Sequence, residues 1–146
     1  IIYTSDGNDY FIESKKNTGN QVRPIKNNIV VLAFPPNSSK NPTSMWKFIV
    51  YDPVTVWKRC FKKNGNIKSG QHTEDPFTCL NFSPSSRDIQ NKMIGEPQLE
   101  NEIKKCCVLW DSNKIALTKI SKNIAVRTQS SKLSTSIELK SYGIIS

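Results

Sequence analysis

The stretch that most constrains the fold is residues 44–63, SMWKFIVYDPVTVWKRCFKK, where aromatic, β-branched and cationic residues crowd around one turn signal. In its first half, apolar side chains fall on both faces of an extended chain, which is typical of a central strand. Asp52-Pro53 interrupts the run, because proline lacks an amide donor and keeps the preceding residue out of the α region. We therefore expect a buried strand, a bend at Pro53 and a return strand over residues 54–61.

Other short apolar or alternating runs also predict strands. An opening hairpin is expected around residues 5–8, SDGN, because Gly and Asn tolerate positive φ. The most apolar run, residues 28–34, is short enough to be a strand covered on both faces. The remaining strand candidates are residues 77–82, 106–110, 114–120, 123–129 and 135–145.

One region has helical character. Ser83 can cap a helix and Pro84 fits its first position, so a helix is expected over about residues 85–94. A second short helix is expected over residues 97–104. Many strands against one or two short helices predict a mostly β single domain over residues 1–146. It would be an antiparallel sandwich or a small barrel with a short helical insertion around residues 84–105, and the alternative is an α+β fold.

Four cysteines lie in the middle of the chain, at Cys60, Cys79, Cys106 and Cys107. An even count in a secreted protein implies two disulfides, for which three connectivities exist. Neighbours on a strand point to opposite faces, so we expect Cys60 and Cys79 each to pair with one member of the adjacent pair. A zinc site with His72 would normally include a C-x-x-C spacing, which is missing, and no metal is expected.

The net charge is +9, from 21 Lys and Arg against 12 Asp and Glu. Such a charge suits nucleic acid, an anionic glycan or an acidic protein, although a Lys- and Asn-rich composition can also simply give a solvated surface. The chain lacks the signatures of an RNA-recognition motif, a zinc finger or a basic zipper, so nucleic acid is not the expected partner. The candidate binding cluster is Lys58, Arg59, Lys62, Lys63, Lys104, Lys105, Lys114, Lys119, Lys122 and Arg127, with Trp57 and Trp110 either as stacking planes or as core.

Catalysis is not expected. His72 is the only histidine and lies near Glu74 and Asp75, yet no nucleophile signature such as G-x-S-x-G accompanies it. The six glycines form no phosphate-binding loop, so we expect no cofactor.

An extracellular location is expected from the cysteines and from two sequons, at Asn37 and Asn81. No apolar run approaches the roughly 20 residues of a membrane helix, so no membrane insertion is expected. The first functional hypothesis is a secreted or surface-exposed, disulfide-bonded glycoprotein that binds a receptor, a ligand or a host factor. Its recognition loops would be residues 15–28, 35–43 and 64–76. The alternative is a heparin-like glycan binder that uses the basic cluster.

Overall fold

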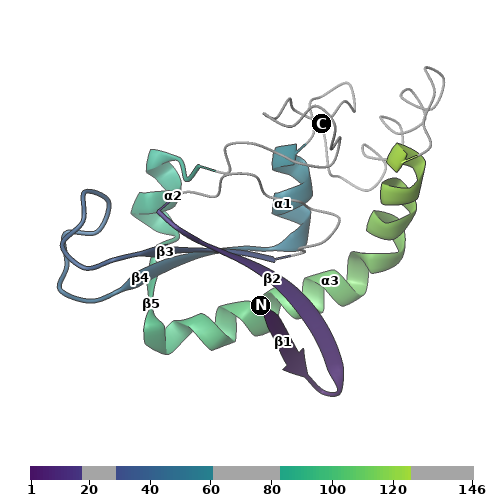
Figure 1. Ribbon diagram of the computed structural model, residues 1–146, viewed down its shortest axis with the longest axis horizontal. Coiled ribbons are helices and arrows are strands. Elements are labelled where there is room, and N and C mark those ends of the chain that lie inside the picture. The colour runs from purple at the N-terminus through teal and green to yellow at the C-terminus, as the bar shows by residue number, and fades with distance from the viewer. Residues whose placement is uncertain (18–28, 61–82, 126–146) are drawn as a thin grey trace.

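The computed structural model describes residues 1–17, 29–60 and 83–125 (Figure 1). The side chains of Trp57, Cys60 and residues 119–125 lie outside this description. The elements are β1 (Ile2–Ser5), β2 (Asn8–Lys16), β3 (Ile29–Phe34), β4 (Lys47–Tyr51), α1 (Pro53–Cys60), α2 (Ser86–Asn91), β5 (Ile94–Gly95) and α3 (Glu96–Ala125).

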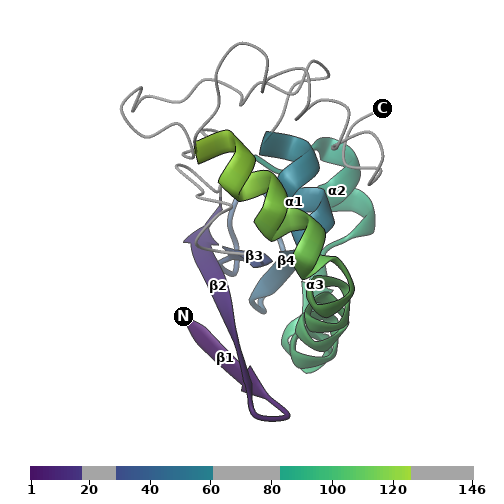
Figure 2. The ribbon, with the colours of Figure 1, turned by 90° about the vertical axis from the view of Figure 1, so that its right-hand side faces the viewer.

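One five-stranded sheet with the order β1-β2-β3-β4-β5 forms the centre of the described structure. β2 and β3 pair in parallel, and the other neighbours pair antiparallel. Figure 2 shows the β1–β2 hairpin curling toward α3, so that the sheet resembles half of a barrel. The predicted mostly β fold is therefore only partly confirmed. The described part contains no sandwich, and it agrees better with the α+β alternative.

The opening hairpin is confirmed. Ser5 pairs with Asn8, which leaves Asp6 and Gly7 as a two-residue loop. Both have positive φ, 52° and 79°. This is the backbone of a type I′ turn, whose twist matches that of the flanking strands.

The sheet is buried on both faces at β3, as the apolar run predicted. α3 covers one face, and α1 and α2 lie on the other (Figure 1). The buried cluster on the α3 face consists of Tyr10, Ile12, Ile29, Val31, Cys106 and Cys107. The buried side chains of the opposite face are Val30, Leu32, Phe34, Ile49 and Tyr51.

The predicted return strand after Pro53 is wrong, because these residues form α1. The Asp52 carboxylate caps the helix: the Thr55 amide donates to Oδ1 at 2.9 Å and the Thr55 hydroxyl donates to Oδ2 at 2.8 Å. Pro53 takes the first helical position, where its missing N–H costs nothing. Asp-Pro thus starts a helix here. Val56, one of the β-branched residues that suggested a strand, lies in this helix with its side chain fully buried.

The predicted strands at residues 106–110, 114–120 and the beginning of 123–129 are also wrong, because α3 continues without a break to Ala125. Its buried side follows Leu99, Ile103, Cys106 and Trp110, a spacing of three or four residues that fits a helix. The first predicted helix is shorter than expected: α2 ends at Asn91, and its cap is Ser85 instead of Ser83. The predicted strands 77–82 and 135–145 lie outside the described residues. The single domain stays a prediction.

α3 bends near its middle, so that its first half runs along the sheet and its second half passes beside α1 (Figures 1 and 2). Two side chains in this region compete for helix carbonyls. The Ser112 hydroxyl donates to the Val108 carbonyl at 3.0 Å, and the Asn113 amide donates to the Leu109 carbonyl at 2.8 Å. Such bonds to the preceding turn bend helices, and we attribute the bend to them.

Candidate functional site

The most distinctive surface of the described chain is the β3–β4 loop, residues 35–46. It projects from one end of the sheet, beyond the start of α3 (Figure 1). Its backbone turns tightly at Asn37, where φ is 54°, and a bridge between Ser38 and Asn41 closes the turn. The loop is therefore folded on itself.

The Asn41 side chain organises this loop from within and is fully buried. Its amide nitrogen lies 3.0, 3.2 and 2.8 Å from the carbonyl oxygens of Phe34, Pro35 and Met45. Its carbonyl oxygen accepts from the Thr43 hydroxyl at 2.6 Å and from the Thr43 amide at 3.2 Å. One side chain thus satisfies backbone groups at both ends of the loop, which fixes its shape without a packed apolar core.

Met45 and Trp46 follow this hub, and both side chains are partly exposed to solvent. Met45 is 62% exposed and Trp46 is 44% exposed. The sequence placed both residues in the central strand, but β4 begins only at Lys47. Asn41 and Thr43 donate hydrogen bonds to the backbone carbonyl of Met45. None of the hydrogen bonds of Asn41 involves the side chain of Met45 or Trp46. The two large apolar groups are therefore available to a partner.

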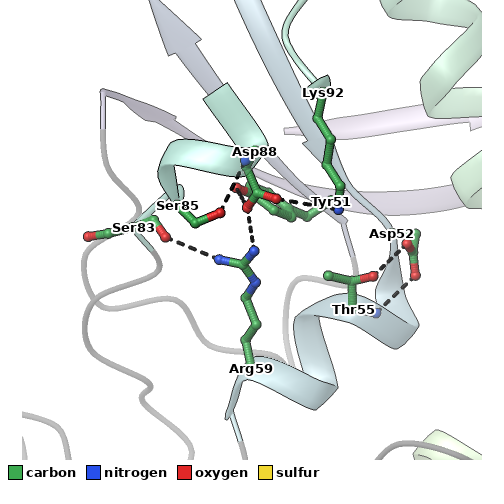
Figure 3. A network of polar contacts seen from close by, with 8 residues as sticks. All are labelled: Tyr51, Asp52, Thr55, Arg59, Ser83, Ser85, Asp88 and Lys92. Carbon is green, nitrogen blue, oxygen red and sulfur yellow. Dashed lines mark hydrogen bonds and ion pairs between the residues drawn. The ribbon is translucent and has the colours of Figure 1, made fainter. Parts of the chain in front are cut away.

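A second cluster of polar contacts joins α1, α2 and β4 and is centred on Asp88 (Figure 3). This carboxylate accepts from the Tyr51 hydroxyl at 2.8 Å and forms an ion pair with Arg59. Lys92 lies 3.7 Å from its other oxygen. The Arg59 guanidinium also donates to the Ser83 carbonyl at 3.1 Å and stacks 4.7 Å from the centre of the Tyr51 ring.

The electrostatics of this cluster are those of a structural contact. Burial by itself would raise the pKa of Asp88, but hydrogen bonds from Tyr51 and Arg59 and the nearby cations together lower the pKa below its ordinary value. Burial and the bond to Asp88 raise the pKa of Tyr51. The carboxylate is ionised and held by Tyr51, Arg59 and Lys92, which join three elements of the fold.

The described residues include two buried thiols and no group placed to hold a metal ion. Burial raises the pKa of Cys106 to about 12 and also raises that of Cys107, so both thiols stay protonated and poorly nucleophilic at neutral pH. No group of three His, Cys, Asp or Glu residues is placed to bind a metal ion within this part of the chain. His72 with its neighbours Glu74 and Asp75 lies outside the description.

The predicted basic cluster is only partly visible, and most of its visible members have partners. Arg59 pairs with Asp88, Lys104 with Glu100 and Lys105 with Glu102. Lys58 and Lys114 are exposed on α1 and α3. Trp110 is partly buried and packs against the buried cluster, which favours a core position over a stacking plane. Lys119 and Lys122 are in α3, but their side chains are not described. Lys62, Lys63 and Arg127 lie outside the described residues.

The structure disagrees with the predicted disulfides. Cys106 and Cys107 are both buried and carry free thiols in the structure, against the expectation that each is bridged. They lie on a helix, so the alternation of a strand that underlay the expected pairing does not apply. Cys79 and the side chain of Cys60 fall outside the described residues.

The two sequons differ in what can be said of them. Asn37 is exposed at the tip of the β3–β4 loop, where a glycan would have room. Asn81 lies outside the described residues. Glycosylation stays a prediction at both.

No protein-family model matches the chain, and searches of curated proteins and of solved structures gave no significant match. Among the described helices, none combines the length and the apolar character that crossing a membrane requires.

The residues that sequence reasoning missed are Asn41, Met45 and Trp46. Residues 35–43 were named as a recognition loop, but its boundary was drawn too early. A signal was present: Pro42, Thr43 and Ser44 directly precede Met45, and such residues favour turns over strand interiors.

Proposed function

We propose that this chain is a binding module that recognises another protein through Met45 and Trp46 at the end of the β3–β4 loop. The observation that carries the proposal is the exposure of these two side chains on a loop that the buried Asn41 already holds in shape. Trp is the residue most enriched among those that dominate binding energy at interfaces. Met adapts its shape to varied partners.

The order of the loop supports this function energetically. Association costs free energy when loops and side chains must be immobilised, and a loop fixed in advance avoids part of that cost. The five hydrogen-bonded contacts of the Asn41 side chain are made in the unbound chain. Burying the Trp46 ring against a partner would then contribute about 2 kcal/mol, the size expected of a dominant contact.

An extracellular setting remains part of the proposal. The exposed Asn37 sequon supports it, because a glycan at this tip would be tolerated. The free thiols of Cys106 and Cys107 remove support from a disulfide-bonded module. The partner would accordingly be a receptor, a ligand or a host factor outside the cell.

The test is a binding screen of the purified chain against an array of extracellular proteins, repeated with Trp46→Ala and Met45→Ala. We expect Trp46→Ala to weaken the binding of a captured partner by roughly 30-fold, which corresponds to about 2 kcal/mol. Ile115→Ala is the matched control, since Ile115 is a large apolar residue exposed on α3, away from the loop. Partners that bind both loop variants as well as the wild type would contradict the proposal.

The alternative proposal, an anionic-glycan binder, has weaker support because Arg59, Lys104 and Lys105 are engaged with carboxylates. Elution from heparin at a much higher salt concentration than from a cation exchanger would favour it.

A further inference from the structure

The end of the sheet that carries Met45 and Trp46 is also cationic. The loop and the first residue of β4 contain Lys40 and Lys47 and no Asp or Glu. Lys16 lies at the same end, because it pairs with Ala33 while Lys47 pairs with Phe34, the next residue of β3. All three lysines thus lie at the end of the sheet that carries the exposed apolar pair, with Lys16 and Lys47 on opposite faces because Ala33 and Phe34 are successive residues of β3.

These lysines differ from most other cations of the described chain. Lys15, Arg59, Lys92, Lys104 and Lys105 each form an ion pair with a carboxylate. Within the same described residues, Lys16, Lys40 and Lys47 form none.

An acidic residue, Glu96, lies next to this end of the sheet but pairs with none of these lysines. Glu96 follows Gly95, the register partner of Lys47, but no ion pair joins Glu96 to Lys47. Within the described residues, these three lysines therefore form no ion pair that would neutralise their charge.

We propose that the partner segment of this surface is an acidic peptide stretch with an apolar or aromatic anchor, in which carboxylates meet Lys16, Lys40 and Lys47 while the anchor packs on Met45 and Trp46. This inference rests on the proposed function and specifies the chemistry of its partner. Complementary charge steers encounter and sets the register, while the apolar contact supplies most of the affinity. Binding therefore weakens as salt is added, because the lysines are solvent-accessible and their field is screened.

The test uses a phage-displayed library of random linear peptides, panned on the full chain at low salt. We expect enriched peptides to carry Asp or Glu within a few positions of Trp, Phe, Leu or Met. Synthetic copies should bind the full chain, lose most of their affinity to Trp46→Ala, and weaken between 50 and 500 mM salt by roughly tenfold or more.

Charge reversal adds a second readout. Lys40→Glu should lower peptide affinity by roughly three- to tenfold, because it replaces an attraction by a repulsion. Lys114→Glu is the matched control: Lys114 is exposed on α3, makes no ion pair in the described chain, and should leave affinity unchanged. Thermal unfolding of both variants establishes that they are folded, and Lys47→Glu provides an independent second reversal.

The outcomes separate this inference from the function on which it rests. Peptides that require Trp46 but show no acidic bias, no salt dependence and no response to Lys40→Glu or Lys47→Glu would overturn the inference and leave the proposed function standing. A selection that yields no Trp46-dependent peptide would overturn both.

Discussion

At the scale of single residues, two buried polar side chains decide how the surface is presented. Asn41 holds the β3–β4 loop, and Asp88 ties α1 and α2 to β4. Both are buried, and both form hydrogen bonds that join separate parts of the chain. A buried polar group that is satisfied fixes one arrangement, because any other leaves a donor or acceptor without a partner.

The first prediction concerns Asn41. Asn41→Ala should lower the free energy of unfolding by about 2–3 kcal/mol, because it removes the partner of backbone carbonyls at both ends of the loop. Urea denaturation followed by circular dichroism measures this loss. Asn91→Ala, at the exposed end of α2, should change stability by less than about 0.5 kcal/mol. Equal stability of the two variants would show that the loop does not depend on Asn41.

The second prediction concerns acid unfolding. The folded-state pKa of Asp88 is lowered from its ordinary 3.8, so on acidification the unfolded chain takes up this proton before the folded chain does. The contribution of Asp88 to stability is therefore complete above about pH 4 and is lost as pH falls through the folded pKa.

Asp88→Asn should be less stable than the wild type at pH 7, by about 2 kcal/mol, because Arg59 and Tyr51 lose a charged acceptor. The difference should shrink between about pH 4 and pH 2. Urea titrations across this range measure it, and a constant difference would contradict the assignment of Asp88 as an ionised partner.

The third prediction concerns the adjacent thiols. Because burial raises the pKa of both, iodoacetamide at pH 8 should leave Cys106 and Cys107 unmodified in the folded protein. After denaturation without a reducing agent, both should react, as peptide mass spectrometry would show. Disulfides with Cys60 and Cys79, the pairing expected from the sequence, would instead protect the two residues until a reductant is added.

At the scale of elements, the clearest sequence-to-structure relation is the β1–β2 hairpin. Gly7 has a φ of 79°, a region that a residue with a Cβ adopts only with strain. A Cβ at Gly7 would meet nothing within 4 Å. Any cost of substitution is therefore conformational, which makes this position a clean test of the turn.

The fourth prediction follows. Gly7→Ala should lower the free energy of unfolding by about 1 kcal/mol, and Gly7→Asn should cost less, since Asn tolerates positive φ. Thermal or urea unfolding gives both values. Stability unchanged by Gly7→Ala would indicate that the hairpin contributes nothing to the folded state.

The hairpin and the buried run of β3 could be predicted because their signals are local. The helices could not be predicted as reliably from the same patterns. Val54 and Val56 favour strands by propensity, yet the Asp52-Pro53 cap starts a helix there. In α3, short apolar runs such as residues 106–110 fit either period, and only packing against the sheet decides between them.

At the scale of the whole molecule, the parallel pairing of β2 with β3 was not accessible from sequence. Whether two neighbouring strands are parallel or antiparallel depends on the connection between them, and the residues of the strands themselves do not specify it. The same holds for the candidate site. Exposure of Met45 and Trp46 follows from where β4 begins and from the contacts of Asn41, whose partners lie two to seven residues away.

Contacts between residues that precede α2 and residues that follow α1 have a consequence for the integrity of the chain. Tyr51 and Arg59 bind Asp88, β4 pairs with β5, and Tyr10 donates to Asp111 across 101 residues. Two fragments expressed together, residues 1–60 and 61–146, should therefore associate. Co-elution of both fragments on gel filtration would show that non-covalent contacts hold the fold together without an unbroken backbone.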